Sequence, residues 1–239
     1  MDVVPSTWTR TIAGVSIVFL LGTATAQEPN PAEVIRLVDA AVAARFDNVL
    51  GFTDVEHYAV YRGDDQVHPA AEMTVKDTYK RGLGKTYIVM SQSGSSILLH
   101  FGLKPLLENE QTINQSGNVE KSWFNSANYI IKLNSAAVQK LNGRDCFALD
   151  VKPKEVAPNL IIGTIWVDAQ DGTLVQIDGV ASKNPSAFSG TTHMMRQYTN
   201  VNGYSMAIHA RAESDSALFG RTVVTIDYSD YNLEIKTHK

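Results

Sequence analysis

The sequence predicts a mainly β (α+β) protein, in which one antiparallel, curved sheet packs against a few helices. The first observation is residues 160–179, where apolar side chains alternate with polar or small ones on both sides of Asp171-Gly172, a dipeptide that favours a type I′ hairpin turn. The second is that Asn142-Gly143 and Asn202-Gly203 divide further alternating segments in the same way. The third is a helical spacing of apolar residues over 31–46. Successive hairpins without a long crossover indicate an antiparallel meander.

Composition limits the class of protein. The chain has 239 residues, of which 44% are hydrophobic, enough for a substantial core in one domain. The formal charge of -4 disfavours a nucleic-acid partner, which would require a basic face. Cys146 is the single cysteine, so no internal disulfide can form, and its strand-like surroundings favour a buried apolar role.

The N-terminus has the pattern of an export signal. Arg10 precedes an apolar run over 12–21, and Ala24 and Ala26 form an A-x-A site, so we expect a signal peptide at 1–26 that is cleaved after Ala26. The alternative is a membrane anchor, but about ten apolar residues are too short for a helix to cross a hydrocarbon core of ~30 Å. The expected product is a single exported domain over 27–239.

The predicted elements follow the chain. Pro31 opens an amphipathic helix that Asn48 and Gly51 close, and short helices begin near 104–108 and 118–124 inside an insert over 102–128. The insert is the place to expect a lid over a concave sheet, with a simple edge cap as the alternative. Strands are expected at 53–62, 71–80, 84–91, 96–101, 129–133, 138–141, 144–151, 194–199, 204–212 and 221–228.

Motifs for catalysis or metal binding are weak. The run from Gly82 to Thr86 ends like a phosphate loop but has Tyr79 where the pattern needs glycine, so it indicates a tight turn. The six histidines are scattered and form no spacing typical of metal ligands. Four carboxylates are expected as solvated groups at strand ends or turns: Asp168, Asp178, Asp227 and Asp230. The sequence therefore predicts no enzyme, no metal and no cofactor.

A family resemblance accompanies this order of elements. The helix PAEVIRLVDAAVAA, the hairpin WVDAQDGTLVQIDG and the closing FGRTVVTIDYSDYNL resemble the LolA-like outer-membrane lipoprotein-sorting family over nearly the whole mature chain. The resemblance implies a strongly curved sheet that forms an unclosed β-barrel, with the N-terminal helix and short lid helices on its concave side. It implies a periplasmic carrier that shields lipid or lipoprotein acyl chains in an apolar cavity during transfer towards the outer membrane. No motif carries over an individual functional residue.

The cavity residues that we expect are apolar side chains at alternate strand positions and on the lid. Ordinary core packing is the alternative for each. The expected partners are acyl chains and membrane-bound donor and acceptor proteins, and the expected state is a monomer. Two other functions stay open: an envelope stress sensor that uses the same fold to bind a protein, and an enzyme, which would need a polar cluster pointing inward. The twelve residues are Val55, Tyr61, Tyr87, Val89, Leu99, Leu106, Leu107, Trp123, Phe124, Ile165, Val167 and Ile177.

Overall fold

The computed structural model describes residues 1, 29–135, 137–183, 191–216 and 220–237. The predicted signal peptide and its cleavage site after Ala26 lie outside these residues. Within them, no helix has the length and apolar character that crossing a membrane requires.

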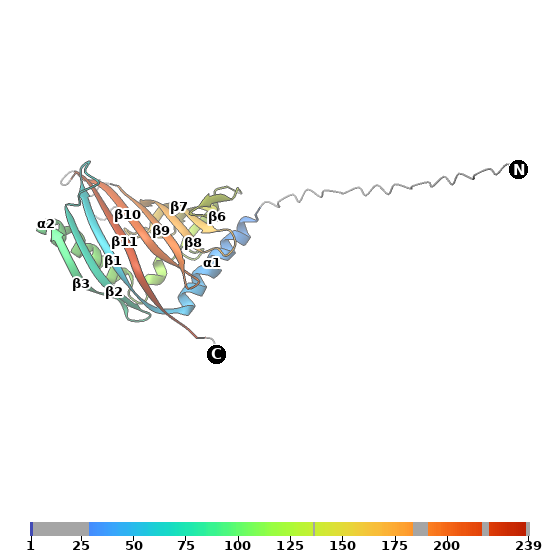
Figure 1. Cartoon of the computed structure of the whole chain (residues 1–239), viewed down its shortest axis with the longest axis horizontal. Coiled ribbons are helices and arrows are strands. Elements are labelled where there is room, and N and C mark those ends of the chain that lie inside the picture. Colours follow the sequence, from blue (N-terminus) through green and yellow to red (C-terminus); the bar gives the residue numbers. More distant parts are fainter. Residues whose placement is uncertain (2–28, 136, 184–190, 217–219, 238–239) are drawn as a thin grey trace.

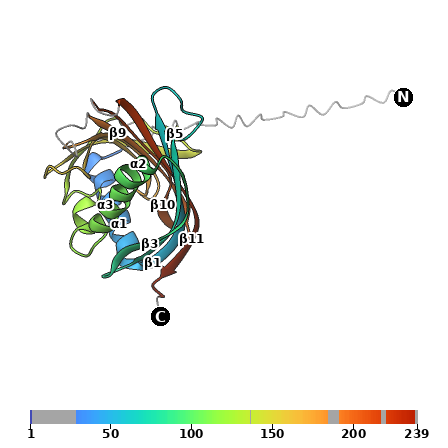
Figure 2. The same cartoon turned by 90° about the vertical axis from the view of Figure 1, so that its left-hand side faces the viewer.

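One antiparallel sheet of eleven strands dominates the structure, as predicted (Figure 1). Its order is β3-β2-β1-β11-β10-β9-β8-β7-β6-β4, and β5 pairs with β6 beside this path. The sheet curves strongly without closing, and α1, α2 and α3 lie inside the curve (Figure 2). The strands are β1 Val49–Arg62, β2 Ala71–Lys80, β3 Gly84–Gly94, β4 Tyr129–Leu133, β5 Gln139–Leu141, β6 Arg144–Pro153, β7 Ile161–Asp168, β8 Leu174–Ala181, β9 Thr192–Val201, β10 Tyr204–Ser216 and β11 Gly220–Ile235.

The meander is interrupted once, between β3 and β4. These two strands end the sheet on opposite sides, so the connection between them crosses the concave face. It contains the helices α2 (Ser96–Leu98), η1 (Leu99–Leu103, one π-helical turn), α3 (Lys104–Ile113) and η2 (Val119–Ser122). The first strand along the chain, β1, pairs with the last, β11. The pairing runs from Val49 opposite Ile235 to Arg62 opposite Thr222. This long pairing extends β11 to Ile235, beyond the predicted end at 228.

Helix α1 (Pro31–Asn48) begins where the sequence predicts. Pro31 occupies the first turn, and the Asn30 side chain accepts a hydrogen bond from the Ala32 amide. The prediction that Gly51 closes the helix is wrong, because β1 already starts at Val49. A side chain at Gly51 would place its Cβ 2.8 Å from the Tyr79 carbonyl oxygen, so this glycine permits close packing of β1 on β2.

Two of the three predicted turns are confirmed. Asn142-Gly143 and Asn202-Gly203 have positive φ at both residues, as a type I′ turn requires. The third prediction is wrong: Asp171 does not adopt positive φ, and residues 169–173 form a wider connection between β7 and β8. The reason is helix α1, because Gly172 (φ 71°) lies against it, and an added Cβ would stand 2.5 Å from the Leu37 carbonyl carbon.

The predicted strand at 96–101 is also wrong. These residues form α2 and the first part of η1, and the Ser95 side chain caps α2 by accepting from the Leu98 amide at 3.5 Å. Apolar residues are so closely spaced here that the pattern fits both the helical period of about 3.6 residues and the strand period of about 2. The capping serine favours the helix. Leu103 then becomes buried against the sheet.

The apolar core has two parts, one at each end of the concave face. The α1-side core packs Val34 and Val38 of α1 on β6, β7 and β8, including Leu149, Ile165 and Ile177. The α3-side core packs Leu103 and Leu107 on β1 and β2; its other buried members are Tyr58, Val60, Ala71, Met73, Val75, Ala210 and Ile226. Cys146 is buried, as expected.

Candidate functional site

An open apolar pocket of about 570 Å³ lies between β3 and the helices α2, η1 and α3. It forms because α2 and η1 turn back over the edge of the sheet after β3 ends. Its floor is the edge of the α3-side core, and its rim is the helical turn. The lining residues are Met73, Tyr87, Val89, Gln92, Ser96, Ile97, Leu99, His100, Phe101, Lys104 and Leu107.

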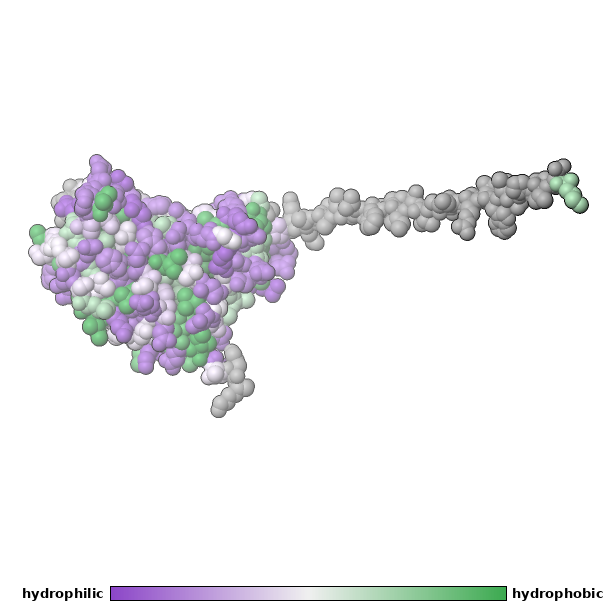
Figure 3. Space-filling model, viewed as in Figure 1, coloured by the Kyte–Doolittle hydropathy of each residue, from purple (hydrophilic) through white to green (hydrophobic). Residues whose placement is uncertain are grey.

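Large apolar side chains around this pocket are exposed to solvent. Phe101 is 73% exposed, Ile97 61% and Val89 42%. Figure 3 shows hydrophobic side chains reaching the surface at the end of the molecule where α2 lies. A contiguous group of exposed apolar side chains indicates a site that an apolar ligand or a partner covers.

Four of the twelve predicted cavity residues come together here. Tyr87 and Val89 of β3, Leu99 of η1 and Leu107 of α3 all line the pocket. Leu106 packs against the α3-side core beside it. These residues all lie within 87–107, and they meet because the helical insert folds back on β3.

Five others lie in the other half of the molecule. Ile165, Val167 and Ile177 are buried in the α1-side core. Trp123 packs on Phe46 of α1, with ring centroids 4.3 Å apart. Phe124 stacks on Tyr129, with centroids 4.9 Å apart. The structure therefore separates the predicted lid aromatics from the pocket.

Val55 and Tyr61 lie on the opposite face of the sheet. Along β1, Tyr58 and Val60 point into the α3-side core, so the odd-numbered residues of this strand point away from it. An error of one residue in the assumed phase moves every side chain of a strand to the other face. With the correct phase, Asp54 and Glu56 of the same strand point inward.

A buried charge network lies beside the pocket, centred on Lys85 of β3. The Lys85 ammonium lies 2.7 Å from Glu56 Oε1, 2.8 Å from Asp77 Oδ2 and 2.8 Å from Glu110 Oε2. Tyr58 donates its hydroxyl hydrogen to Glu56. Because Glu110 belongs to α3 and the other partners to the sheet, the network joins the helix to β1, β2 and β3.

The electrostatics of this network follow from burial. Burial raises the pKa of Asp54 to about 7 and that of Glu56 to about 8, so Glu56 is mostly protonated at neutral pH and Asp54 is partly protonated. Burial alone would lower the pKa of Lys85, but Glu110, Glu56 and Asp77 outweigh it and hold that pKa well above its usual value. Burial likewise opposes ionisation of Glu110, yet Lys85 and Arg196 lower the Glu110 pKa.

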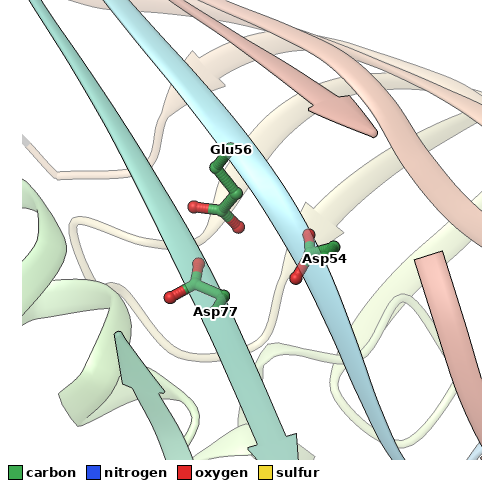
Figure 4. A group of neighbouring side chains, drawn as sticks. All are labelled: Asp54, Glu56 and Asp77. Carbon is green, nitrogen blue, oxygen red and sulfur yellow. The ribbon is translucent and has the colours of Figure 1, made fainter. Parts of the chain in front are cut away.

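Three members of this region have the ligand atoms that a metal ion requires. Asp54 and Glu56 of β1 and Asp77 of β2 each offer a carboxylate oxygen, and these atoms lie within 4.8 Å of one another (Figure 4). The Lys85 ammonium already bonds two of the three residues, and retained protons reduce the remaining charge. An acidic group balanced in this way does not by itself define a metal site.

One signal in the sequence could have revealed this network. In β2 the residues Ala71, Met73, Val75 and Tyr79 alternate clearly with polar ones, and Asp77 occupies the apolar side of that alternation. A carboxylate at such a position is buried and needs a partner. Lys85 and Glu110 had no comparable signal, because their meeting depends on how the insert folds.

Three of the four carboxylates expected at strand ends or turns lie next to an arginine or a histidine. Asp168 accepts from Arg144 Nε at 2.8 Å, Asp178 lies 2.9 Å from His193, and Asp227 lies 2.7 Å from His209. Asp178 and Asp227 stand within β8 and β11, not at their ends. Asp230 has a positive φ of 55°, at a bulge where β11 shifts register against β1.

Comparisons with known proteins find likenesses to solved structures at low sequence identity. No family model and no curated protein matches the chain. The chain is similar to a solved LolA superfamily protein from Nitrosomonas europaea, with 13% identity over 87% of this chain and 96% of that chain and a TM-score of 0.44. It is also similar to a putative outer membrane lipoprotein-sorting protein domain from Vibrio parahaemolyticus, with 15% identity over 88% of this chain and 96% of that chain and a TM-score of 0.49. A DUF1329 family protein from Desulfovibrio piger has 14% identity over 88% of this chain and 96% of that chain, with a TM-score of 0.45. The expected resemblance to LolA-like proteins is found again among these structures.

Proposed function

We propose that this protein is a periplasmic carrier that binds lipid or lipoprotein acyl chains and shields them from water during transfer towards the outer membrane. The observation that carries the proposal is the open apolar pocket between β3 and the α2–η1 turn, with Phe101, Ile97 and Val89 exposed around it. Its volume of about 570 Å³ falls within the range of small-molecule sites. The proposed role is binding, without catalysis.

The physical reason for such a carrier is the cost of exposing an acyl chain to water. Each methylene group that leaves water contributes about 0.8 kcal/mol. A chain laid in the pocket would contact Tyr87, Leu99 and Leu107 and would cover apolar surface that is now exposed. Binding would therefore remove apolar area from water on both partners.

The proposal includes export and docking partners. A signal peptide over 1–26 would deliver one mature domain, 27–239, to the periplasm as a monomer. Loading and release would need a membrane-bound donor and acceptor. Purification from an envelope fraction and N-terminal sequencing test the location and the cleavage after Ala26.

Native mass spectrometry of protein purified without detergent tests the cargo directly. The expected result is a bound species of lipid or lipopeptide mass that leaves on delipidation and returns when lipid is added. A clean apo mass with no uptake from added lipid would contradict the carrier role. That result would favour the stress-sensor alternative, in which the same fold binds a protein.

A pair of surface variants locates the binding site. Phe101→Gln changes an exposed pocket residue, and we expect lipid retention to fall severalfold with little change in thermal stability. Leu83→Gln is the matched control, because Leu83 is 79% exposed in the turn between β2 and β3 and does not line the pocket. Equal retention in both variants would place the acyl chain elsewhere.

A further inference from the structure

The centre of the concave face is lined by polar and aromatic side chains. β9, β10 and β11 lie between β8, which belongs to the α1-side core, and β1, which belongs to the α3-side core, and they contribute Ala210 and Ile226 to the α3-side core. Arg196 of β9 stands opposite Ile177 of β8 and Ala210 of β10, which are both buried, so its side chain shares their inward face. Tyr198 follows two residues later on the same face.

A second arginine reaches this region from helix α1. Arg45 lies on the helix face of Val34 and Val38, and its Nε donates to the Ser205 carbonyl oxygen at 3.2 Å. Its Nη2 lies 3.7 Å from the Met206 sulfur. Met206 precedes Ala207, which stands opposite Tyr198, so Arg45 reaches the part of β10 that pairs with Tyr198. Burial raises the pKa of Tyr198, whereas Arg196 and Arg45 both act to lower it.

Neither guanidinium has a carboxylate in contact. Among the residues that the structure describes, no Asp or Glu oxygen lies within 4.0 Å of Arg45 or Arg196. Glu110 is the carboxylate whose charge helps to raise the Arg196 pKa, but its Oε2 atom already lies 2.8 Å from Lys85 Nζ. Both arginines remain partly accessible to solvent. Two half-buried positive charges without a counter-ion favour an anion as a partner.

We propose that Arg196 and Arg45 bind the phosphate group of an anionic ligand, with the Tyr198 hydroxyl as a further donor. The planar guanidinium fork matches a phosphate through paired hydrogen bonds. This proposal deepens the proposed function, on which it rests, because it names the headgroup chemistry of the amphiphile that the carrier would bind. The same chemistry would also accept free phosphate, so the test separates the two sources.

The test titrates delipidated protein with three probes and measures binding by native mass spectrometry. The probes are dioleoylphosphatidylglycerol, dioleoylglycerol with the same chains but no phosphate, and inorganic phosphate. Arg196→Gln and Arg45→Gln should each weaken binding of the phospholipid about tenfold and change dioleoylglycerol binding by less than about twofold. Arg196→Lys should retain part of the affinity, since it keeps the charge.

The matched control is Arg211→Gln, which removes an arginine from the outer face of β10, where it bonds Glu213 at 3.0 Å. It should leave all three affinities unchanged. Wild-type affinity for the phospholipid in Arg196→Gln and Arg45→Gln would overturn the headgroup site but leave the carrier role intact. Failure of the wild type to bind either lipid would instead overturn the carrier role. Arginine-dependent binding of inorganic phosphate alone would overturn the assignment to a lipid headgroup.

Discussion

At the scale of single residues, Lys85 has the most demanding environment in the described structure. Its side chain is 8% exposed, and its ammonium lies within 2.8 Å of carboxylate oxygens from β1, β2 and α3. A charge buried among several opposite charges gives little net stability compared with an apolar core, but its removal leaves the partners uncompensated. The consequence is an asymmetric response to mutation.

Lys85→Met tests this asymmetry. Because it leaves Glu56, Asp77 and Glu110 without their shared cation, we expect the free energy of unfolding to fall by about 3–5 kcal/mol. Chemical denaturation at pH 7 measures the change. Lys104→Met removes a lysine from the exposed start of α3 and serves as the control. A loss for Lys85→Met no larger than that for Lys104→Met would show that the network does not hold the structure together.

At the scale of elements, the connection between β7 and β8 depends on its contact with α1. Gly172 combines a positive φ with a close approach to the Leu37 backbone. Gly203 also has positive φ, 91°, but has open space around the missing side chain. The two glycines therefore separate backbone strain from contact with the helix.

Gly172→Ala and Gly203→Ala form a matched pair. Backbone strain alone should cost each variant about 1–2 kcal/mol. Gly172→Ala should lose more than Gly203→Ala, since its new methyl group would meet the helix backbone. Thermal unfolding of both variants checks this, and equal losses would mean that α1 moves aside without penalty.

Prediction from sequence succeeded for elements with a local cause. The start of α1 at Pro31 and the turns at Asn142 and Asn202 are set by capping and backbone conformation, and the strand at 129–133 was placed correctly. The strand expected at 96–101 failed because closely spaced apolar residues do not distinguish the two periods. The candidate site was only partly predictable: Tyr87, Val89, Leu99 and Leu107 were expected in a cavity, but the partners of Lys85 depend on tertiary contacts.

At the scale of the whole molecule, stability should depend on pH. Asp54 and Glu56 keep protons in the folded chain up to pH about 7 and 8, whereas unfolded carboxyls lose them near pH 4. The folded chain therefore binds more protons between these limits, so the free energy of unfolding falls as pH rises through this window. The limit for one proton is about 1.4 kcal/mol per pH unit.

Thermal unfolding between pH 5 and 9 measures this effect. The midpoint temperature should decrease as pH rises, and Glu56→Gln should flatten the curve because its amide cannot ionise. Glu72→Gln, on the outer face of β2, removes a carboxylate outside the network and should keep the wild-type slope. A midpoint that rises from pH 5 to 8 would contradict the retention of protons.

The pairing of β1 with β11 has a consequence for how the chain is made. These strands are the first and the last along the chain, and their pairing places Val49 opposite Ile235. Contacts between segments so distant in sequence form late, because a long loop must close before they stabilise anything. During synthesis β1 would lack its neighbour β11 until that strand leaves the ribosome. The growing chain therefore cannot complete its sheet until β11 has been made.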